Sequence, residues 1–415
     1  MGERADDIDV QDAASRRRGP TRRFEARRHA IIRSAVVEMN RKGVRGMTLG
    51  EVAARLDLVP TGVIYYFKNK EELASAALLQ GLESFDALVA AGDGARDAST
   101  GLAAFVRAWF DYRRRVSAGE ADEIPVFNDI RALNCAPVNE AYVQVFRHVR
   151  TLFSPGGRLL RPHANTRAHL LLSQMLWAPA WLRRVEPTDY PRTAERTIDI
   201  LANGFLGDGA AWPKVRSLNL ERAGDPSAQA SSELFLRAAT ELINEEGYHG
   251  ASVERISARL HVSKGAFYHH ITNKDELVAA CFQRTFDIMW RAIQAADEVG
   301  GTGLEVLATL AATLIERQVL GAPLLRSSAL TTVPEGLREG LLEAFDRVSY
   351  RFASIICDGV ADGSIRPLDV NVAAQTLTAA INAAAELRSW VPGPPEAVAE
   401  LYVRSLFEGL VSPVS

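Results

Sequence analysis

The chain has 415 residues, which is too long for a single hydrophobic core and predicts two or three domains. Hydrophobic residues make up 47% of the sequence and charged residues 24%, and this balance excludes a wholly disordered chain. The formal net charge of −3 excludes nucleic-acid binding through overall charge, so any such surface has to be local. Three scattered cysteines are too few for a disulfide framework or a metal knuckle, and they fit a reducing compartment.

Residues 1–25 are interpreted as a disordered basic tail. They have acids where a signal peptide carries cations, and they have no apolar segment. No run of about 18 apolar residues occurs elsewhere, so we expect a cytoplasmic protein without a membrane partner. Residues 16–28 hold seven arginines and one glutamate, a net charge of +6. This segment is either an arm that follows a DNA minor groove or phosphates, or a solvated tail without a role.

An internal repeat organises the chain. When Gly43 is written over Gly247, an offset of 204, the following residues coincide: Arg33 with Arg237, Ala35 with Ala239, Gly46 with Gly250, Arg55-Leu56 with Arg259-Leu260, Asn69-Lys70 with Asn273-Lys274, and Glu72-Leu73 with Glu276-Leu277. The relation continues weakly to the end of each half, where Gly204 pairs with Gly409. The repeat therefore covers a whole domain.

Apolar residues follow a helical period through both halves, so an all-α fold is predicted. We expect short N-terminal helical domains at 26–73 and 233–277, and longer helical domains at 74–218 and 278–415. The stretch 219–232 is polar, contains Gly and Pro, and is interpreted as the linker. The segment 371–388 is rich in alanine, which permits close approach of helices, and 397–410 adds an apolar stripe; both match segments at the end of the first half.

The sequence "GASVERISARLHVSKGAFYHHITNKDEL" (residues 250–277) predicts a helix-turn-helix in the second half. Gly247 is expected to end the preceding helix, Ser252 to cap the next, and Asn273 to cap a fourth with Glu276 three residues on. Ser263 is a good cap for a short third helix whose N-terminal face is polar and cationic. Such a helix enters the major groove N-terminus first. The expected DNA contacts are Ser252, Ser263, Lys264, Gly265, Tyr268, His269 and Lys274.

This stretch resembles the DNA-binding domain of the TetR family of bacterial transcriptional regulators. The resemblance covers about 45 residues in each half. It implies that the remainder of each half is a ligand-binding and dimerisation domain, with an apolar cavity for a small molecule and two helices for a four-helix bundle.

The first half resembles the family less closely. "TLGEVAARLDLV" and "YYFKNKEEL" fit, but Val59, Pro60, Thr61 and Ile64 stand where the second half has Ser263, Lys264, Gly265 and Tyr268. Proline suits the first helical position, whereas valine is a poor cap and costs about 1 kcal/mol relative to serine. Residues 31–73 carry a net charge of +2 and residues 235–277 one of −1. The expected contacts of this head are Thr48, Pro60, Thr61, Tyr65, Tyr66 and Lys70.

Metal-binding and catalytic interpretations of single residues are less favoured. His269 and His270 point about 100 degrees apart on a helix and have no further ligand, so no metal site is expected. No catalytic motif or cofactor fingerprint occurs, so neither an enzyme nor a cofactor is predicted. Aromatic residues of the middle helices are either core or lining of an effector pocket: Trp109, Tyr112, Phe127, Trp177, Trp181, Phe282 and Trp290.

The interpretation is a pseudo-dimer within one chain, formed by two TetR-like halves. It predicts a regulator that binds double-stranded operator DNA through two unlike heads and is released by a small apolar effector, with repression as the default mode. Two alternatives stay open. In the first alternative, the first head has become structural, and two chains use their second heads on a palindrome. In the second alternative, both heads have lost DNA recognition, and the chain is a ligand-binding or scaffolding protein.

Overall fold

The computed structural model describes residues 22–127, 130–153, 159–218, 220, 226–250, 252–260, 273–326, 329–330, 333 and 335–413. Over these ranges the chain is helical, and its β-type pairing is confined to an isolated antiparallel bridge between Leu206 and Ile365. The prediction of an all-α fold is therefore confirmed.

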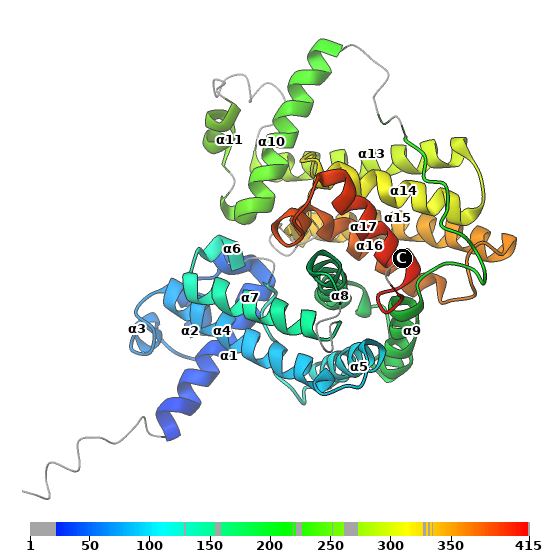
Figure 1. Ribbon diagram of the computed structural model, residues 1–415. Coiled ribbons are helices and arrows are strands. Elements are labelled where there is room, and N and C mark those ends of the chain that lie inside the picture. Colours follow the sequence, from blue (N-terminus) through cyan, green and yellow to red (C-terminus); the bar gives the residue numbers. More distant parts are fainter. Residues whose placement is uncertain are drawn as a thin grey trace, which may run out of the picture.

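The first half contains a short helical head and a body of longer helices. Its helices are α1 (Arg22–Gly46), α2 (Leu49–Ala54), α3 (Pro60–Ile64), α4 (Lys70–Val89), η2 (Ala90–Gly92), α5 (Ala98–Ser117), α6 (Ile130–Leu133), α7 (Ala136–Thr151), α8 (Arg161–Leu182), η4 (Pro187–Asp189) and α9 (Tyr190–Asn203). A connecting segment leaves α9 and runs along the second half (Figure 1).

The second half follows a similar order over its described residues. Its helices are α10 (Pro226–Gly250), α11 (Val253–Leu260), α13 (Lys274–Val299), α14 (Gly303–Val319), α15 (Glu335–Asp362), α16 (Val370–Ala383), η6 (Ala384–Ser389) and α17 (Pro395–Glu408). In the first half α4 packs against α1, α5 and α7, and in the second half α13 packs against α10, α14 and α15. The stretch Lys70–Gly92 is the one described helix long and apolar enough to cross a membrane, and in this fold it is a packed helix of the first half.

The two halves meet in a bundle near the centre of Figure 1. Helix α8 packs against α16 and α17, and α9 packs against α16. Polar side chains of α8 reinforce the apolar contact: Gln174 Nε2 donates to the carbonyl of Thr376 at 3.2 Å, and Asn165 Nδ2 donates to the carbonyl of Trp390 at 2.6 Å. The predicted pseudo-dimer within one chain is therefore confirmed.

The halves also meet in a backbone crossing that directly follows α9 and α17. The amide of Phe205 donates to the carbonyl of Phe407 at 2.8 Å, and the amide of Leu410 donates to the carbonyl of Leu201 at 2.7 Å. Gly204 and Gly409, which the repeat aligns, lie between these bonds with φ of 67° and 94°. A Cβ on Gly204 would stand 2.1 Å from the carbonyl oxygen of Phe407, so only glycine fits.

Helix caps agree with the sequence, and helix ends agree less well. Asn69 Oδ1 accepts from the amide of Glu72 at 2.8 Å, and Asn273 Oδ1 accepts from the amide of Glu276 at 2.9 Å, as predicted for Asn273. Helix α1 already begins at Arg22, inside the stretch 1–25 expected to be disordered, and α10 begins at Pro226, inside the stretch expected as linker. Helix α10 also continues past Gly247, where we expected it to end, and reaches Gly250.

The glycine crossing gives a stability prediction with a matched control. Gly204→Ala combines a positive φ with a backbone clash, so we expect a loss of roughly 3 kcal/mol or more, whereas Gly209→Ala has a φ of 71° but meets nothing within 4 Å and should lose about 1 kcal/mol. Thermal unfolding followed by circular dichroism measures both. Equal melting temperatures for the two variants would contradict the crossing as a tight contact.

Candidate DNA-binding heads and effector cavity

The first head is a helix-turn-helix built from α2 and α3. Thr48 caps α2, and its Oγ1 accepts from the amide of Glu51 at 3.3 Å. Asp57 takes a φ of 54° in the turn between the helices. On α3, Val63 is buried and holds the helix against the head. The predicted contact Thr48 is exposed, but its hydroxyl already serves this cap.

The outer face of α3 is exposed and almost uncharged. Val59 is 65% exposed, Ile64 46% and Tyr65 74%, and the side chains of Pro60 and Thr61 are also exposed. Val59 makes no capping hydrogen bond, as predicted for valine at this position. The face offers a hydroxyl from Thr61 and one from Tyr65 to a groove, and its helix start carries no cation.

An aromatic cluster attaches the arginine-rich start of α1 to this helix. The ring of Phe24 lies 4.8 Å from that of Tyr66, whose centroid lies 5.1 Å from that of Tyr65. Tyr66, a predicted DNA contact, is therefore half-buried in this cluster. Arg22 and Arg23 precede Phe24 and are exposed, so the cluster places two cations beside the recognition helix.

The lysines at the start of α4 and α13 have different surroundings. Lys70 Nζ donates to the carbonyl of Arg45 at 2.9 Å and closes the first head between α1 and α4. Burial lowers the pKa of Lys274, with Asp275 opposing this change and Arg45 adding to it. Lys274 of the second head therefore lies near Arg45 of the first. Both lysines were predicted as DNA contacts, Lys274 for its cation and for the free N–H groups at the start of its helix.

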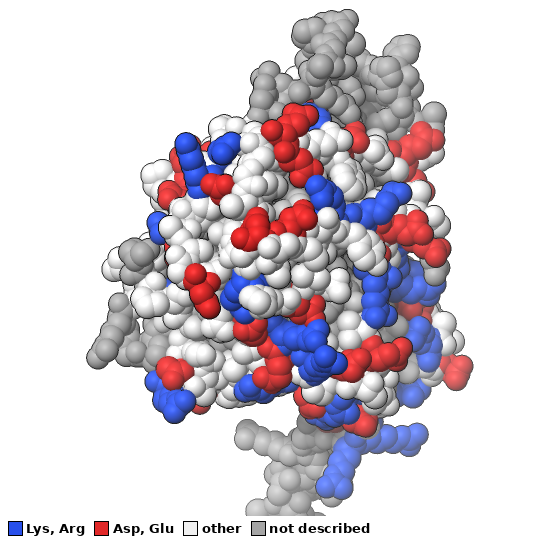
Figure 2. Space-filling view, turned by 90° about the vertical axis from the view of Figure 1, so that its right-hand side faces the viewer, with Lys and Arg blue, Asp and Glu red and all other residues white. Residues whose placement is uncertain are grey.

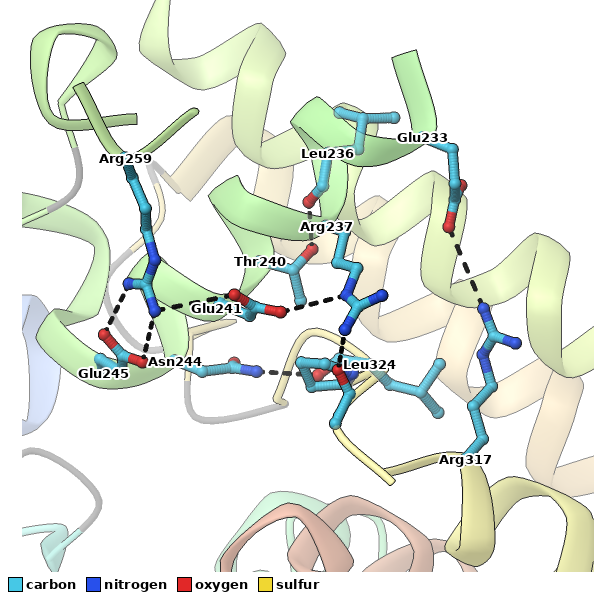
Figure 3. A network of polar contacts seen from close by, with 12 residues as sticks. Glu233, Leu236, Arg237, Thr240, Glu241, Asn244, Glu245, Arg259, Arg317 and Leu324 are labelled. Carbon is cyan, nitrogen blue, oxygen red and sulfur yellow. Dashed lines mark hydrogen bonds and ion pairs between the residues drawn. The ribbon is translucent and has the colours of Figure 1, made fainter. Parts of the chain in front are cut away.

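The second head is described in part. Ser252 Oγ accepts from the amide of Arg255 at 3.3 Å and starts α11, as expected for a cap. Arg259 ties α11 to α10 through Glu245 at 2.8 Å and Glu241 at 3.6 Å (Figure 3). Ser263, Lys264, Gly265, Tyr268 and His269 lie outside the described residues.

In each head an asparagine forms hydrogen bonds with the backbone of the body, and the sequence analysis missed both asparagines. Asn40 Nδ2 donates to the carbonyl of Ile124 at 3.0 Å, and its Oδ1 accepts from the amide of Val126 at 2.8 Å. Asn244 Nδ2 donates to the carbonyl of Leu324 at 2.9 Å, and its Oδ1 accepts from the amide of Arg326 at 2.9 Å (Figure 3 shows the bond to Leu324). We call these the asparagine clamps.

A cavity of about 420 Å³ lies between the halves, whereas the resemblance implied one within each half. Its first-half lining comes from α6, α7, α8 and Phe127, and its second-half lining from Arg326, α16, η6 and Trp390. The lining residues are Phe127, Ile130, Asn139, Tyr142, Val143, His169, Leu172, Ser173, Leu176, Trp177, Arg326, Ala379, Asn382, Ala383, Glu386, Ser389 and Trp390. Phe127 and Trp177 are thus the two predicted pocket aromatics found in this lining.

The structure places the other predicted pocket aromatics elsewhere. Trp109 is buried with its ring 5.1 Å from Phe85, and Tyr112 donates to the carbonyl of Asp122 at 2.7 Å. Phe282 is fully buried, and its ring centroid lies 6.2 Å from that of Phe345. Trp181 and Trp290 are half-buried and do not line this cavity.

The side of the molecule away from α3 and α11 carries mixed charge. Figure 2 shows the right-hand side of Figure 1, and there basic and acidic side chains are interspersed among uncharged ones. This face offers no continuous basic surface, over its described residues, that could follow a DNA backbone.

Comparison with known proteins gives two matches to one family model. "Bacterial regulatory proteins, tetR family" matches residues 31–77 and residues 235–281. The Transposon Tn10 TetC protein of Escherichia coli is 38% identical over 56 residues, which are 14% of this chain and 28% of TetC. The HTH-type transcriptional repressor DhaR of Mycobacterium sp. (strain GP1) is 28% identical over 135 residues, 32% of this chain and 68% of DhaR. The chain thus spans less than a third of TetC.

Two solved structures are similar to part of this chain. The TetR family transcriptional regulator PfmR from Thermus thermophilus is 24% identical with a TM-score of 0.36, covering 42% of this chain and 98% of PfmR. The transcriptional regulator FadR from Bacillus subtilis, solved in complex with stearoyl-CoA, is 21% identical with a TM-score of 0.32, covering 43% of this chain and 98% of FadR.

The helix pair α4 and α7, which links the first head to the cavity wall, gives a pH prediction. His148 lies 2.7 Å from Asp86 and 2.9 Å from Asp93. Burial lowers the pKa of His148, but hydrogen bonds to Asp93 and Asp86 outweigh this, and the net pKa is raised. Its stabilisation is complete below the unfolded pKa of about 6.5 and is lost as pH rises through the folded pKa.

We therefore expect His148→Gln to lower the melting temperature most near pH 6 and progressively less toward pH 9. His163 serves as the control of opposite sign, because burial and then Arg167 lower its pKa. His163→Gln should raise relative stability at low pH and lose this effect as pH rises. Melting curves of both variants across this pH range measure the effect, and a His148→Gln difference that grows with pH would contradict the assignment.

Proposed function

Because this chain carries two DNA-binding domains of the TetR family of bacterial regulatory proteins in tandem, we propose that it is a ligand-responsive transcriptional regulator. In this proposal residues 26–73 and 233–277 are the DNA-binding heads. The protein is cytoplasmic, and one chain binds one operator. The observation that carries it is the repeat of the head on two halves that pack as a pseudo-dimer.

The position of the heads supports DNA binding by both. Helices α2, α3 and α11 lie on one side of the molecule in Figure 1, away from the face of mixed charge in Figure 2. A dimer of helix-turn-helix proteins binds two half-sites about one helical turn apart, and two heads of one chain can do the same. In the first head, Thr61, Tyr65 and the exposed Arg22 and Arg23 are the proposed contacts.

The unlike surfaces of the two heads predict unlike half-sites. The start of α3 offers Val59 and Pro60, whereas the aligned positions of the second head are Ser263 and Lys264. Repression is the proposed default mode. An effector acts by binding better to one arrangement of the heads than to the other, which shifts the population and releases DNA.

One observation favours a second candidate. The exposed face of α3 has no cation and its cap is poor, so the first head is the weaker DNA reader. In the rival proposal this head is structural, and two chains associate to place two second heads on a palindrome.

Selection of DNA from a random pool by the purified chain, followed by native mass spectrometry of the complex, separates these proposals. We expect two unlike half-sites bound by one chain. A palindrome bound by two chains would support the rival. If no sequence were enriched at low salt, DNA recognition itself would be refuted.

Substitutions on the selected DNA test the inequality of the heads. Lys264→Ala and Tyr268→Ala should weaken binding at least tenfold, because they remove a cation and a hydroxyl from the stronger reader. Pro60→Ala and Tyr65→Ala should weaken it only a few-fold. Fluorescence anisotropy gives the affinities, and equal losses from both pairs would count against unlike heads.

The arginines beside α3 give a salt-dependence prediction. Each phosphate contact contributes about 0.9 to the slope of log affinity against log salt, so Arg22→Gln with Arg23→Gln should reduce the slope by about 2. Arg192→Gln is the control, because Arg192 is exposed on α9, in the bundle. An unchanged slope in the double variant would show that the arm does not touch DNA.

A further inference from the structure

We propose that the cavity between the halves is a single effector site for a planar aromatic ligand bearing a carboxylate or similar anionic group. The inference rests on the ligand-responsive function proposed above, and it names the ligand class and the route from the ligand to the heads.

The aromatic part of the site is rigid and comes from both halves. Trp177 of α8 donates from Nε1 to Gln375 at 3.1 Å, which fixes its indole. Trp390 of the second half stacks on Phe146 of the first, with ring centroids 3.8 Å apart and planes 18° apart. Phe127 and Tyr142 add two further rings to the lining. About 420 Å³ bounded by fixed rings suits a fused aromatic ring system.

The charged part of the site favours an anion. Arg326 Nη1 donates to Glu386 Oε1 at 2.5 Å, and the two side chains are 16% and 25% exposed. Arg326 Nε is buried and has no hydrogen-bond partner among the described residues. Arg326 lines the cavity, so a guanidinium donor that does not bond Glu386 can take a carboxylate of the ligand while Nη1 keeps its bond to Glu386.

A cationic ligand is disfavoured by the same pair. A cation at Glu386 would lie close to the guanidinium of Arg326 and compete with it for the carboxylate, and loss of the partner of a largely buried guanidinium is costly. Glu386 already balances the charge of Arg326. An anion adds bonds to Arg326, whereas a cation is repelled by it.

The asparagine clamps connect this one site to both heads. Phe127 directly follows the residues that Asn40 of α1 holds, and Arg326 is itself held through its backbone by Asn244 of α10. Both clamped segments therefore contribute a side chain to the cavity. Helix α6, whose Ile130 also lines the cavity, packs against both α1 and α10. A ligand that moves these segments acts on both heads at once.

Ligand class is tested by fluorescence titration of the full chain with pyrene-1-carboxylate and with pyren-1-ylmethylammonium, which share one ring system. We expect one equivalent of the carboxylate per chain and at least tenfold weaker binding of the cation. Arg326→Gln should weaken the carboxylate at least tenfold, whereas Arg388→Gln, an exposed η6 arginine outside the lining, should leave it unchanged. Glu386→Gln should tighten it, which keeps the test valid if Arg326→Gln fails to fold.

Two equivalents per chain, equal binding of both probes, or no effect of Arg326→Gln and Glu386→Gln would overturn the proposed site. These outcomes concern the ligand alone. The selection of DNA described above tests the regulator function independently, so failure of one is distinguishable from failure of the other.

The route to the heads is tested by electron spin resonance distances between labels at Ala54→Cys and Ala258→Cys, aligned exposed positions on α2 and α11. Cys135→Ser and Cys357→Ser remove the accessible thiols, and Cys281 is buried. We expect pyrene-1-carboxylate to shift the distance, and Asn40→Ala with Asn244→Ala to abolish this shift while the affinity for the probe stays within about twofold. An identical shift in the clamp variant, or probe binding without any shift, would overturn the clamps as the route.

Discussion

The backbone crossing at Gly204 and Gly409 is the constraint from which the rest of the arrangement follows. Two chain segments of different halves touch there without side chains between them, and their amides bond across the contact. This fixes the ends of α9 and α17, and with them the bundle that these helices form with α8 and α16. Each head packs against the body of its own half. The relative position of the two heads therefore depends on the glycine crossing, which lies at the C-terminal end of each half.

The two halves share a pattern but differ where the cavity lies. Helix α8 runs unbroken to Leu182, whereas the aligned α16 ends at Ala383 and continues as the 3-10 helix η6. Toward the end of each half the repeat has an offset of 205, as for Gly204 and Gly409. At this offset Trp181 aligns with Glu386, so an aromatic residue in one half corresponds to a carboxylate in the other. The altered helix and the altered residue together place a charged pair beside fixed aromatic rings, on one side of an otherwise repeated structure.

The sequence was informative about several features that local rules decide. Helical periodicity, the cap at Asn273 and the poor cap at Val59 depend on residues near in sequence and are found in the structure, whereas the helix end expected at Gly247 is not. The cavity depends on contacts between segments as distant as Phe127, Arg326 and Trp390, which no local pattern encodes. Lys70 shows the same limit, because the sequence reveals its charge but not the carbonyl of Arg45 that it binds. Asn40 and Asn244 were within reach, since the repeat aligns them as identical polar residues.

The segment that joins the halves is itself bound to the second half. The amide of Arg216 donates to Thr309 Oγ1 at 3.2 Å, and its guanidinium donates to the carbonyl of Val299 at 2.9 Å. Two recognition modules joined in this way meet at an effective concentration that does not fall when the cell dilutes the protein. In the proposed binding of one chain to one operator, an intramolecular step replaces assembly by subunit encounter, and occupancy of the site then rises with the first power of chain concentration. Gene dosage would accordingly change such occupancy in proportion, without the threshold that a dissociating pair of subunits imposes.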